Sequence, residues 1–170
     1  MTQTNGPKLR DDFKSKKIKR TFTQKINSTP DKIFPLLCPE REKDWLDGWS
    51  YDMIYSESGF AENGAIFKTR YGETVDTIWI VTKYDKELGI IEFVRMTWDV
   101  VVVNISFRLE AVNDTVTDIH VEYIFTSITE KGNEFIEGSS SRQFLEMMKW
   151  WEKSLNYFIM TGNKLLAIKL

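Results

Sequence analysis

Six segments rich in β-branched and aromatic residues follow one another through the middle of the chain, separated only by short turns. Turn-forming pairs such as Asn63-Gly64 lie between them. A parallel crossover needs a dozen or more residues, so connections this short require antiparallel neighbours. We therefore expect antiparallel strands over residues 50–57, 64–71, 74–83, 89–97, 99–110 and 115–126. A seventh strand is expected over residues 17–27, where alternation places three apolar side chains on one face, those of Ile18, Phe22 and Ile26.

Prolines divide the stretch after the first strand into two short helices. Pro30 suits the first position of a helix, and Pro35, only five residues later, prevents a long one. The first helix is therefore expected to end near Cys38. Pro39 then begins a second short helix, expected over residues 39–46.

The last part of the chain predicts one long amphipathic helix, from about residue 130 to 161. Its apolar residues recur at helical spacing and form one face, which consists of Phe144, Met147, Met148, Trp151, Leu155, Phe158 and Ile159. One sheet and one amphipathic helix give a two-layer α+β domain. The seven-stranded sheet has to curve around the helix to cover it, and the two short helices close the gap between the first two strands.

Composition excludes several classes of protein. The chain has 170 residues, 42% of them hydrophobic, which suits one domain with a substantial core. It has no apolar run near the roughly 20 residues of a membrane-spanning helix, and we expect no secretory signal. The single cysteine, Cys38, excludes an internal disulfide and favours a cytoplasmic, reducing location. The motifs of nucleotide, phosphate, zinc-protease and serine-hydrolase sites are absent, so we expect no cofactor.

Charge is concentrated near the start of the chain. Between Lys8 and Arg20 there are seven basic and two acidic residues, whereas the whole chain has a net charge of −2. This basic arm, which we place at residues 1–16 ahead of a single domain over 17–170, indicates either an anionic partner or a solvated, flexible terminus. The acidic body lacks a basic stripe, so we expect no nucleic-acid partner. A weak homodimer is compatible with the sequence.

Three segments resemble proteins of one superfamily. They are "FPLLCPEREKDWLDGW" (Phe34 to Trp49), "IWIVTKYD" (Ile78 to Asp85) and "MMKWWEKSLNYFIMTG" (Met147 to Gly162). Together with the order of elements, they resemble uncharacterised bacterial members of the START-like, birch-pollen-allergen-like superfamily, also called SRPBCC. The resemblance covers nearly the whole chain after about residue 16. It implies the helix-grip fold, and an internal cavity that in other members holds lipids, sterols, hormones or polyketides; fold alone does not choose among these.

Alternation along the strands selects the side chains expected to line such a cavity. The strands contribute Trp79, Phe93, Arg95, Val103, Phe107 and Tyr123, and the helices contribute Trp45, Phe144, Met148 and Trp151. The tryptophans have a plainer interpretation as ordinary core residues. The two methionines of the helix fill gaps in either interpretation.

Arg95 and Tyr123 are the polar residues among these candidates. An inward arginine needs a carboxylate, which either an acidic ligand or an Asp or Glu at the rim could supply. Tyr123 either donates to a ligand carbonyl or bonds to the backbone. Glu42, within the charged run Arg41-Glu42-Lys43-Asp44, either lies on a solvated helix face or turns inward near the cavity mouth.

Two further arrangements are weighed and set aside. Asp118, His120 and Glu122 share one strand face, but neighbours two apart on a strand diverge, so we expect no metal site. Cys38 and His120 lie on faces that keep them apart, which disfavours a thiol dyad.

Three functions remain open. The first is binding or carriage of a lipid- or polyketide-like hydrophobic small molecule, which requires only the cavity. The second is a cofactor-free cyclase or dehydratase acting on a polyketide-like substrate, which needs an acid or base inside the cavity. The third is a protein-interaction module, which would use an exposed apolar surface.

Overall fold

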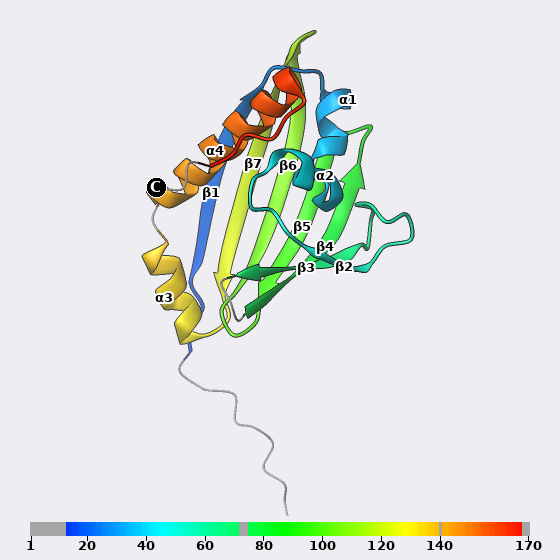
Figure 1. The fold of residues 1–170 in the computed structure, drawn as a ribbon. Helices are drawn as coiled ribbons and strands as arrows, with labels where there is room; N and C mark the ends of the chain where they lie inside the picture. Colours follow the sequence, from blue (N-terminus) through cyan, green and yellow to red (C-terminus); the bar gives the residue numbers. More distant parts are fainter. Residues whose placement is uncertain (1–12, 72–74, 140, 168–170) are drawn as a thin grey trace, which may run out of the picture.

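The structure, a computed structural model, describes residues 13–71, 75–139 and 141–167. Its centre is one curved antiparallel sheet of seven strands in the order β1-β7-β6-β5-β4-β3-β2 (Figure 1). The prediction of seven antiparallel strands is confirmed. The strands are β1 (Lys17–Ile26), β2 (Asp52–Tyr55), β3 (Ile66–Tyr71), β4 (Val75–Asp85), β5 (Ile90–Thr97), β6 (Val101–Asn113) and β7 (Val116–Ser127).

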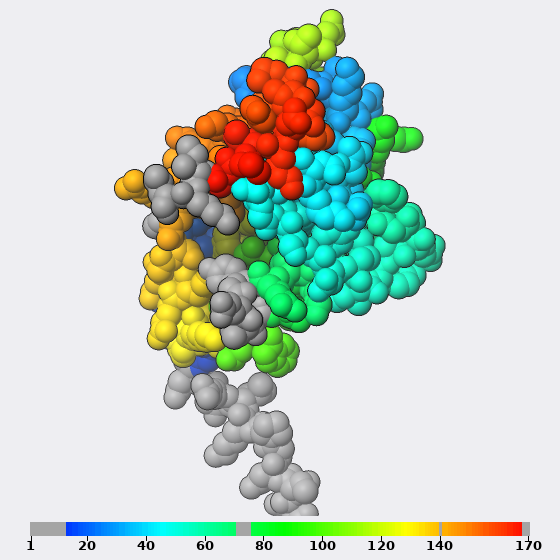
Figure 2. All heavy atoms as spheres, viewed as in Figure 1, coloured from blue at the N-terminus to red at the C-terminus, as the bar shows by residue number. Residues whose placement is uncertain are grey.

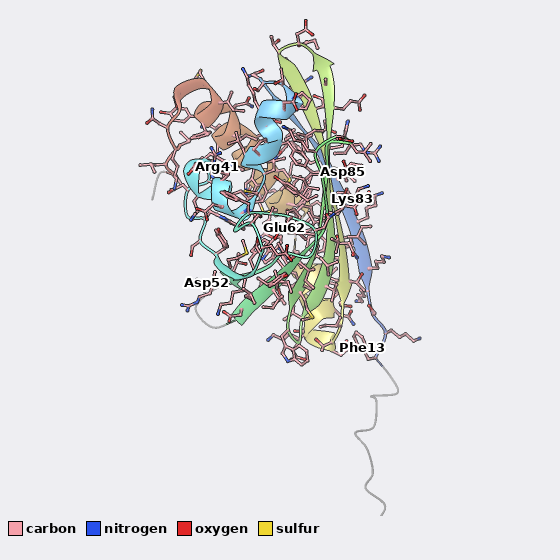
Figure 3. The ribbon with its side chains drawn as sticks, turned by 90° about the vertical axis from the view of Figure 1, so that its right-hand side faces the viewer. Phe13, Arg41, Asp52, Glu62, Lys83 and Asp85 are labelled. Atoms are coloured by element: carbon pink, nitrogen blue, oxygen red, sulfur yellow. The ribbon has the colours of Figure 1, made fainter. Side chains whose placement is uncertain are left out.

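The helices lie on one face of this sheet, so the molecule has two layers (Figure 3). The stretch between β1 and β2 forms two short helices as predicted, with a turn of 3-10 helix, η1, between them. The helices are α1 (Pro30–Ile33), η1 (Phe34–Leu36), α2 (Pro39–Trp45), α3 (Glu130–Gly138) and α4 (Ser141–Thr161). α4 packs along β1 and against α2, whereas α3 packs against β7. Gly162, with φ of +70°, ends α4, and its N–H bonds to the Phe158 carbonyl at 2.7 Å.

The prediction of one helix from 130 to 161 is wrong, because the chain leaves the helix after Gly138. Ser139 has an extended backbone, with ψ of 96°, and α4 begins at Ser141. Glycine and serine are weak helix formers. Arg20 of β1 also binds the break, since its guanidinium donates to the Ser139 carbonyl and to the Ser141 hydroxyl. The C-terminal segment therefore covers the sheet with two separate helices.

The start of α3 is held tightly against the turn between β5 and β6. Thr129 is the N-cap residue: its hydroxyl accepts a bond from the Gly132 N–H at 3.2 Å and donates to the Asp99 carbonyl at 2.7 Å. Gly132 lies so close to this turn that a Cβ atom there would be 1.9 Å from the Val100 carbonyl oxygen. Only glycine allows this approach of the two backbones.

The core lies between the inner face of the sheet and the helices. Buried apolar residues alternate along β5, β6 and β7, and α1, α2 and α4 contribute Ile33, Trp45, Met148 and Leu155 from above. Aromatic rings continue from strand to strand at centroid distances of 5.4–6.5 Å across a chain formed by Phe67, Trp79, Phe93, Phe107 and Tyr123. Ring pairs at this spacing add to the stabilisation that burial supplies.

The predicted N-terminal arm falls mostly on residues outside the described ranges. Its last residues join the sheet, because the Ser15 hydroxyl donates to the Ser127 carbonyl at 2.6 Å and the Lys16 N–H donates to the Ser127 hydroxyl at 2.7 Å. None of the described helices is both long and apolar enough to cross a membrane.

Candidate functional site

A pocket of about 280 Å³ lies between the sheet and α3. Its floor comes from β3, β4, β5 and β6, and its walls come from the β5–β6 turn and from α3. The floor residues are Thr69, Thr77, Arg95, Thr97 and Val101, the walls are Val100 and Phe135, and the rim residues are Arg70 and Lys131. We refer to this space as the α3 pocket.

Three threonines form one row across the floor of the α3 pocket. The strand register pairs Thr69 with Thr77 and Thr77 with Thr97. The Thr77 and Thr97 hydroxyl oxygens are 3.0 Å apart, and the Thr69 hydroxyl accepts a bond of 2.9 Å from the Trp79 indole N–H. These bonds fix the hydroxyl groups where a ligand would meet them.

Arg95 belongs to the next row, where the register places it between Trp79 and Val103. It points into the α3 pocket, the orientation that alternation along its strand predicts. Its guanidinium carbon lies 5.3 Å from the Trp79 ring centroid, a cation–π contact that fixes the charge in place. Arg70 and Lys131 are exposed at the rim, so three cationic side chains border the pocket.

Glu42 is the buried acid of the interior, with only 8% of its surface exposed. Arg41 and Asp44 pair with each other at 2.7 Å, whereas Pro39, Glu42 and Trp45, spaced by three, form the buried face of α2. Figure 3 shows α2 beside the sheet and labels Arg41. Burial raises the pKa of the Glu42 carboxyl to about 8, so this acid is mostly neutral at pH 7.

Tyr123 is the buried phenol among the predicted cavity residues. It is buried on the inner face of β7, and burial raises the pKa of its hydroxyl well above the usual value of 10. A negative charge on Glu42 raises this pKa further, whereas the positive charge of Arg95 lowers it. Burial likewise raises the pKa of Cys38 and of Tyr51, whose hydroxyl donates to Glu40. Burial is thus the main cause of all these shifts.

Of the ten predicted cavity residues, Arg95 is the one found in the described lining of the α3 pocket. The other strand residues pack into the inner-face core, and Phe144, Met148 and Trp45 are buried beneath or within the helices. Trp151 is partly buried and packs against the core, with its ring 6.1 Å from that of Trp45.

Most residues of the α3 pocket were not predicted from the sequence. Thr69 and Thr97 lie two residues after inward-facing Phe67 and Arg95, so alternation could have placed both on the inner face. Lys131 and Phe135 are one helical turn apart on α3. Treating α3 as the start of a longer helix hid their shared face.

Asp118, His120 and Glu122 lie on the outer face of β7, and each contacts side chains of a neighbouring strand. His120 lies 3.1 Å from Glu110 and 3.2 Å from the Thr23 hydroxyl, and Glu122 and Asp118 pair with lysines of β1. In the ranges that the structure describes, no three metal-ligating side chains converge.

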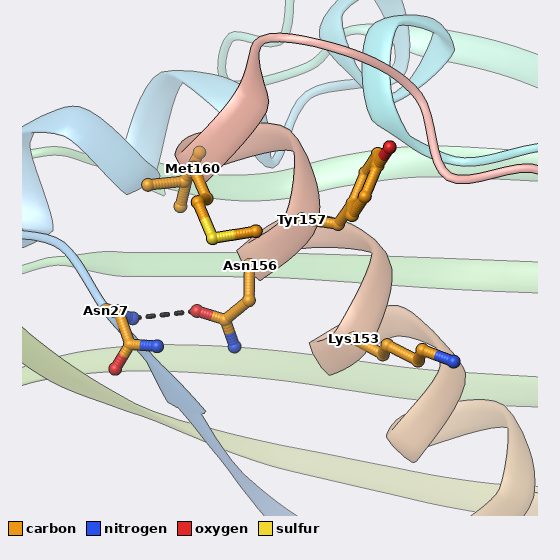
Figure 4. Close-up of a pocket in the computed structure, with 6 residues that line it drawn as sticks. Asn27, Lys153, Asn156, Tyr157 and Met160 are labelled. Atoms are coloured by element: carbon orange, nitrogen blue, oxygen red, sulfur yellow. Dashed lines mark hydrogen bonds between the residues drawn. The ribbon is translucent and has the colours of Figure 1, made fainter.

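A second hollow lies outside the sheet–helix interior, beside the end of β1 and the outer side of α4. Figure 4 shows Asn27, Lys153, Asn156, Tyr157 and Met160 around it. The Asn156 side chain accepts a bond of 2.8 Å from the Asn27 N–H and donates to the Lys25 carbonyl at 2.9 Å. These hydrogen bonds hold α4 against β1. We therefore assign the polar groups beside this hollow a structural role.

Comparison with known proteins places the fold. No family model and no curated protein matches the sequence. Norcoclaurine synthase from Thalictrum flavum, in complex with dopamine and hydroxybenzaldehyde, is similar in structure, with TM-score 0.62 and 12% identity over 90% of this chain and 94% of that one. The ZhuI aromatase/cyclase from Streptomyces sp. R1128 has TM-score 0.60 and 8% identity, over 89% of this chain and 100% of that one.

A third similar structure is Ara h 8.0201, with TM-score 0.56 and 13% identity over 84% of this chain and 98% of that one. The chain therefore has the helix-grip fold of these structures, the fold that the resemblance in its sequence implied. Identities of 8–13% establish the fold and leave the chemistry to the residues of this chain.

Proposed function

We propose that this protein binds a small, largely apolar molecule that carries an acidic group, in the space between the sheet and its helices. The observation that supports this function is the position of Arg95. Its guanidinium is fixed against Trp79 in a pocket whose other floor groups are hydroxyls and a valine. A guanidinium presents paired N–H donors that match both oxygens of a carboxylate.

The rest of the α3 pocket fits the same ligand. Val100, Val101 and Phe135 offer apolar contact, and the threonine row offers hydroxyl groups for a second polar atom. Arg70 and Lys131 at the rim add positive charge that attracts an anion toward the entrance. The volume of about 280 Å³ lies just below the range of roughly 300–1,000 Å³ that is usual for small-molecule sites, which favours a compact molecule such as an aromatic acid.

One similar structure supports a small aromatic ligand. The norcoclaurine synthase structure holds dopamine and hydroxybenzaldehyde, both small aromatic molecules, on the same fold. The buried thiol of Cys38 fits a protein that works in the reducing cytoplasm.

The test compares an acid with its neutral ester. We would titrate 2-naphthoic acid and methyl 2-naphthoate into the parent protein, following naphthyl fluorescence, and repeat both titrations with Arg95→Met. Arg108→Met is the matched control, because Arg108 is exposed on β6 and does not line the α3 pocket. A hydrogen bond to a charged group contributes about 1.5–3 kcal/mol.

The parent and Arg108→Met should therefore bind the acid roughly ten- to a hundredfold more tightly than the ester. Arg95→Met should lose this preference while still binding the ester. Equal affinity for acid and ester in the parent would contradict the anchor, and failure to bind either would contradict the function. Native mass spectrometry of freshly purified protein would give the mass of any small molecule that co-purifies.

A further inference from the structure

The outer face of the sheet changes from polar to apolar along the strands. The described helices all lie on the opposite face, so outward side chains here meet solvent (Figure 3). Sheets with one solvent-facing side normally place polar residues on that side. One row across β5, β6 and β7 follows this rule, because the register aligns Glu92, Ser106 and Glu122. The next two rows do not.

Seven outward residues of these two rows are apolar. The first row runs across β3, β4, β5 and β7, with Asn104 of β6 interrupting it, and the second runs across β4, β5 and β6. Ile80 in the first row is 38% exposed, and Tyr55 of the edge strand β2, 53% exposed, continues this row. The seven residues, which we call the outer patch, are Ile66, Ile80, Val94 and Ile124 in the first row and Ile78, Met96 and Val102 in the second.

The fold does not account for the outer patch. The core is formed by the inward residues of the same strands, and the described lining of the α3 pocket contains no residue of the outer patch. Natural sheets limit exposed apolar surface because it promotes association with other chains. A contiguous apolar area on a solvent-facing sheet therefore indicates an interaction surface.

Charges at the border of the outer patch pair within the chain. Lys68 of β3 lies 3.1 Å from Asp76 and 3.9 Å from Asp52. At the other side of the sheet, Lys19 of β1 pairs with Glu122. An anionic membrane or a highly charged protein would be matched by a surplus of the opposite sign. A border with balanced charge fits a partner with the same balance, and a second copy of this chain has it.

The outer patch is also self-complementary. β5 is the middle of its five strands, with β3 and β4 on one side and β6 and β7 on the other. A two-fold axis along β5 therefore places β4 of one copy opposite β6 of the second, and β3 opposite β7. Val94 and Met96 then face their own counterparts. The remaining facing pairs are Ile78 with Val102, Ile66 with Ile124, and Ile80 with the polar Asn104.

We propose that the outer patch is the interface of a weak homodimer, in which two sheets pack face to face about this axis. Five strands spaced about 4.8 Å apart span about 19 Å, and two rows on one face are about 7 Å apart. This area is a fraction of the roughly 800 Å² per partner that a standard interface buries. The dissociation constant should therefore lie between about 10 µM and 1 mM, so the protein is a monomer when dilute and a dimer when concentrated.

Sedimentation equilibrium measures this association. The mass of the parent should rise from 20.0 kDa toward about 40 kDa as its concentration increases from about 10 µM to about 1 mM. Val94→Lys should raise the dissociation constant by about tenfold or more, because the axis brings the two lysines together. Val112→Lys is the matched control, since Val112 is 51% exposed on β6 outside the outer patch and should dimerise like the parent.

A second measurement tests the position of the axis without a charged substitution. Val94→Cys and Val112→Cys would each be treated with bismaleimidoethane, a short reagent that joins two thiols. Cys38 is buried, so the parent should give little product. Val94→Cys should form a covalent dimer whose yield rises with protein concentration, whereas Val112→Cys should stay mainly monomeric.

Three results would each overturn the proposal. They are a parent mass of 20.0 kDa at every concentration, a Val94→Lys variant that dimerises like the parent, and equal cross-linking of the two cysteine variants. Vesicles of phosphatidylcholine and phosphatidylglycerol test the other occupant. If a monomeric parent bound them and Val94→Lys did not, a membrane surface would cover the outer patch and the homodimer would be wrong. Because the outer patch and the α3 pocket lie on opposite faces of the sheet, failure of the homodimer would leave the binding function intact.

Discussion

The two ends of the inner sheet face have different contents. Beneath α1, α2 and α4, the end we call the packed end, the sheet meets large apolar side chains such as Ile33, Trp45 and Met148, each at 1% exposure or less. Figure 2 shows the atoms of α1, α2 and α4 (blue, cyan and orange to red) in contact with one another, with α3 (yellow) below them. Beneath α3, the end we call the hollow end, the sheet presents threonines, Arg95 and the α3 pocket.

The packed end contributes mainly to stability, and the hollow end holds the proposed binding site. The packed end has three helices and the largest buried side chains, so it supplies most of the apolar burial. The hollow end has one short helix, and its floor hydroxyls and guanidinium leave space that apolar side chains would have filled.

The largest effect expected from this comparison is at the packed end. Trp45 is 1% exposed, and its indole N–H donates to the Leu36 carbonyl at 2.8 Å. Trp45→Ala should lower the free energy of unfolding by about 3–5 kcal/mol, measured by urea denaturation. Trp98→Ala is the control, because Trp98 is 74% exposed in the β5–β6 turn and should leave the midpoint almost unchanged. Similar losses in both variants would mean that the packed end does not dominate stability.

A smaller effect is expected where α3 meets the β5–β6 turn. In Gly132→Ala the new Cβ would be 1.9 Å from the Val100 carbonyl oxygen, so α3 has to move away from the turn. Crowding of this kind costs about 1–3 kcal/mol. Because Val100 also lines the α3 pocket, affinity for 2-naphthoic acid should fall as well.

Gly138→Ala is the matched control for this position. Gly138 belongs to the same helix, but a Cβ there would meet nothing within 4 Å. It should leave binding unchanged and keep or slightly raise stability, because alanine is the better helix former. If both variants bound the acid like the parent, α3 would not shape the pocket.

Local signals in the sequence predicted most of the fold. Alternation and turn residues located every strand, and prolines located α1 and α2, because these features act within a few residues. The break before α4 was missed although Gly138 and Ser139 signal it. The apolar repeat continues across these residues, and the contact that fixes the break comes from Arg20, more than a hundred residues earlier.

The candidate site was predictable only in part. Alternation alone oriented Arg95, since each strand has just two faces. The burial of Glu42 could not be settled from sequence, because its neighbours Arg41 and Lys43 indicate a solvated helix and only the docking of α2 shows which face is covered. The α3 pocket was not predictable as a volume, because it depends on where two separate helices leave the sheet uncovered.

The smallest expected effect concerns the threonine row of the hollow end. The buried Thr77 and Thr97 hydroxyls share one hydrogen bond of 3.0 Å. Thr97→Val should lower the free energy of unfolding by about 1 kcal/mol, because it removes the partner of the Thr77 hydroxyl. The double variant Thr77→Val/Thr97→Val should recover much of that loss, since replacing both partners with apolar groups of the same shape is nearly neutral. A double variant as unstable as the sum of the single ones would show that the hydroxyls act independently, and the polar floor of the α3 pocket would then owe its stability to contacts other than this pair.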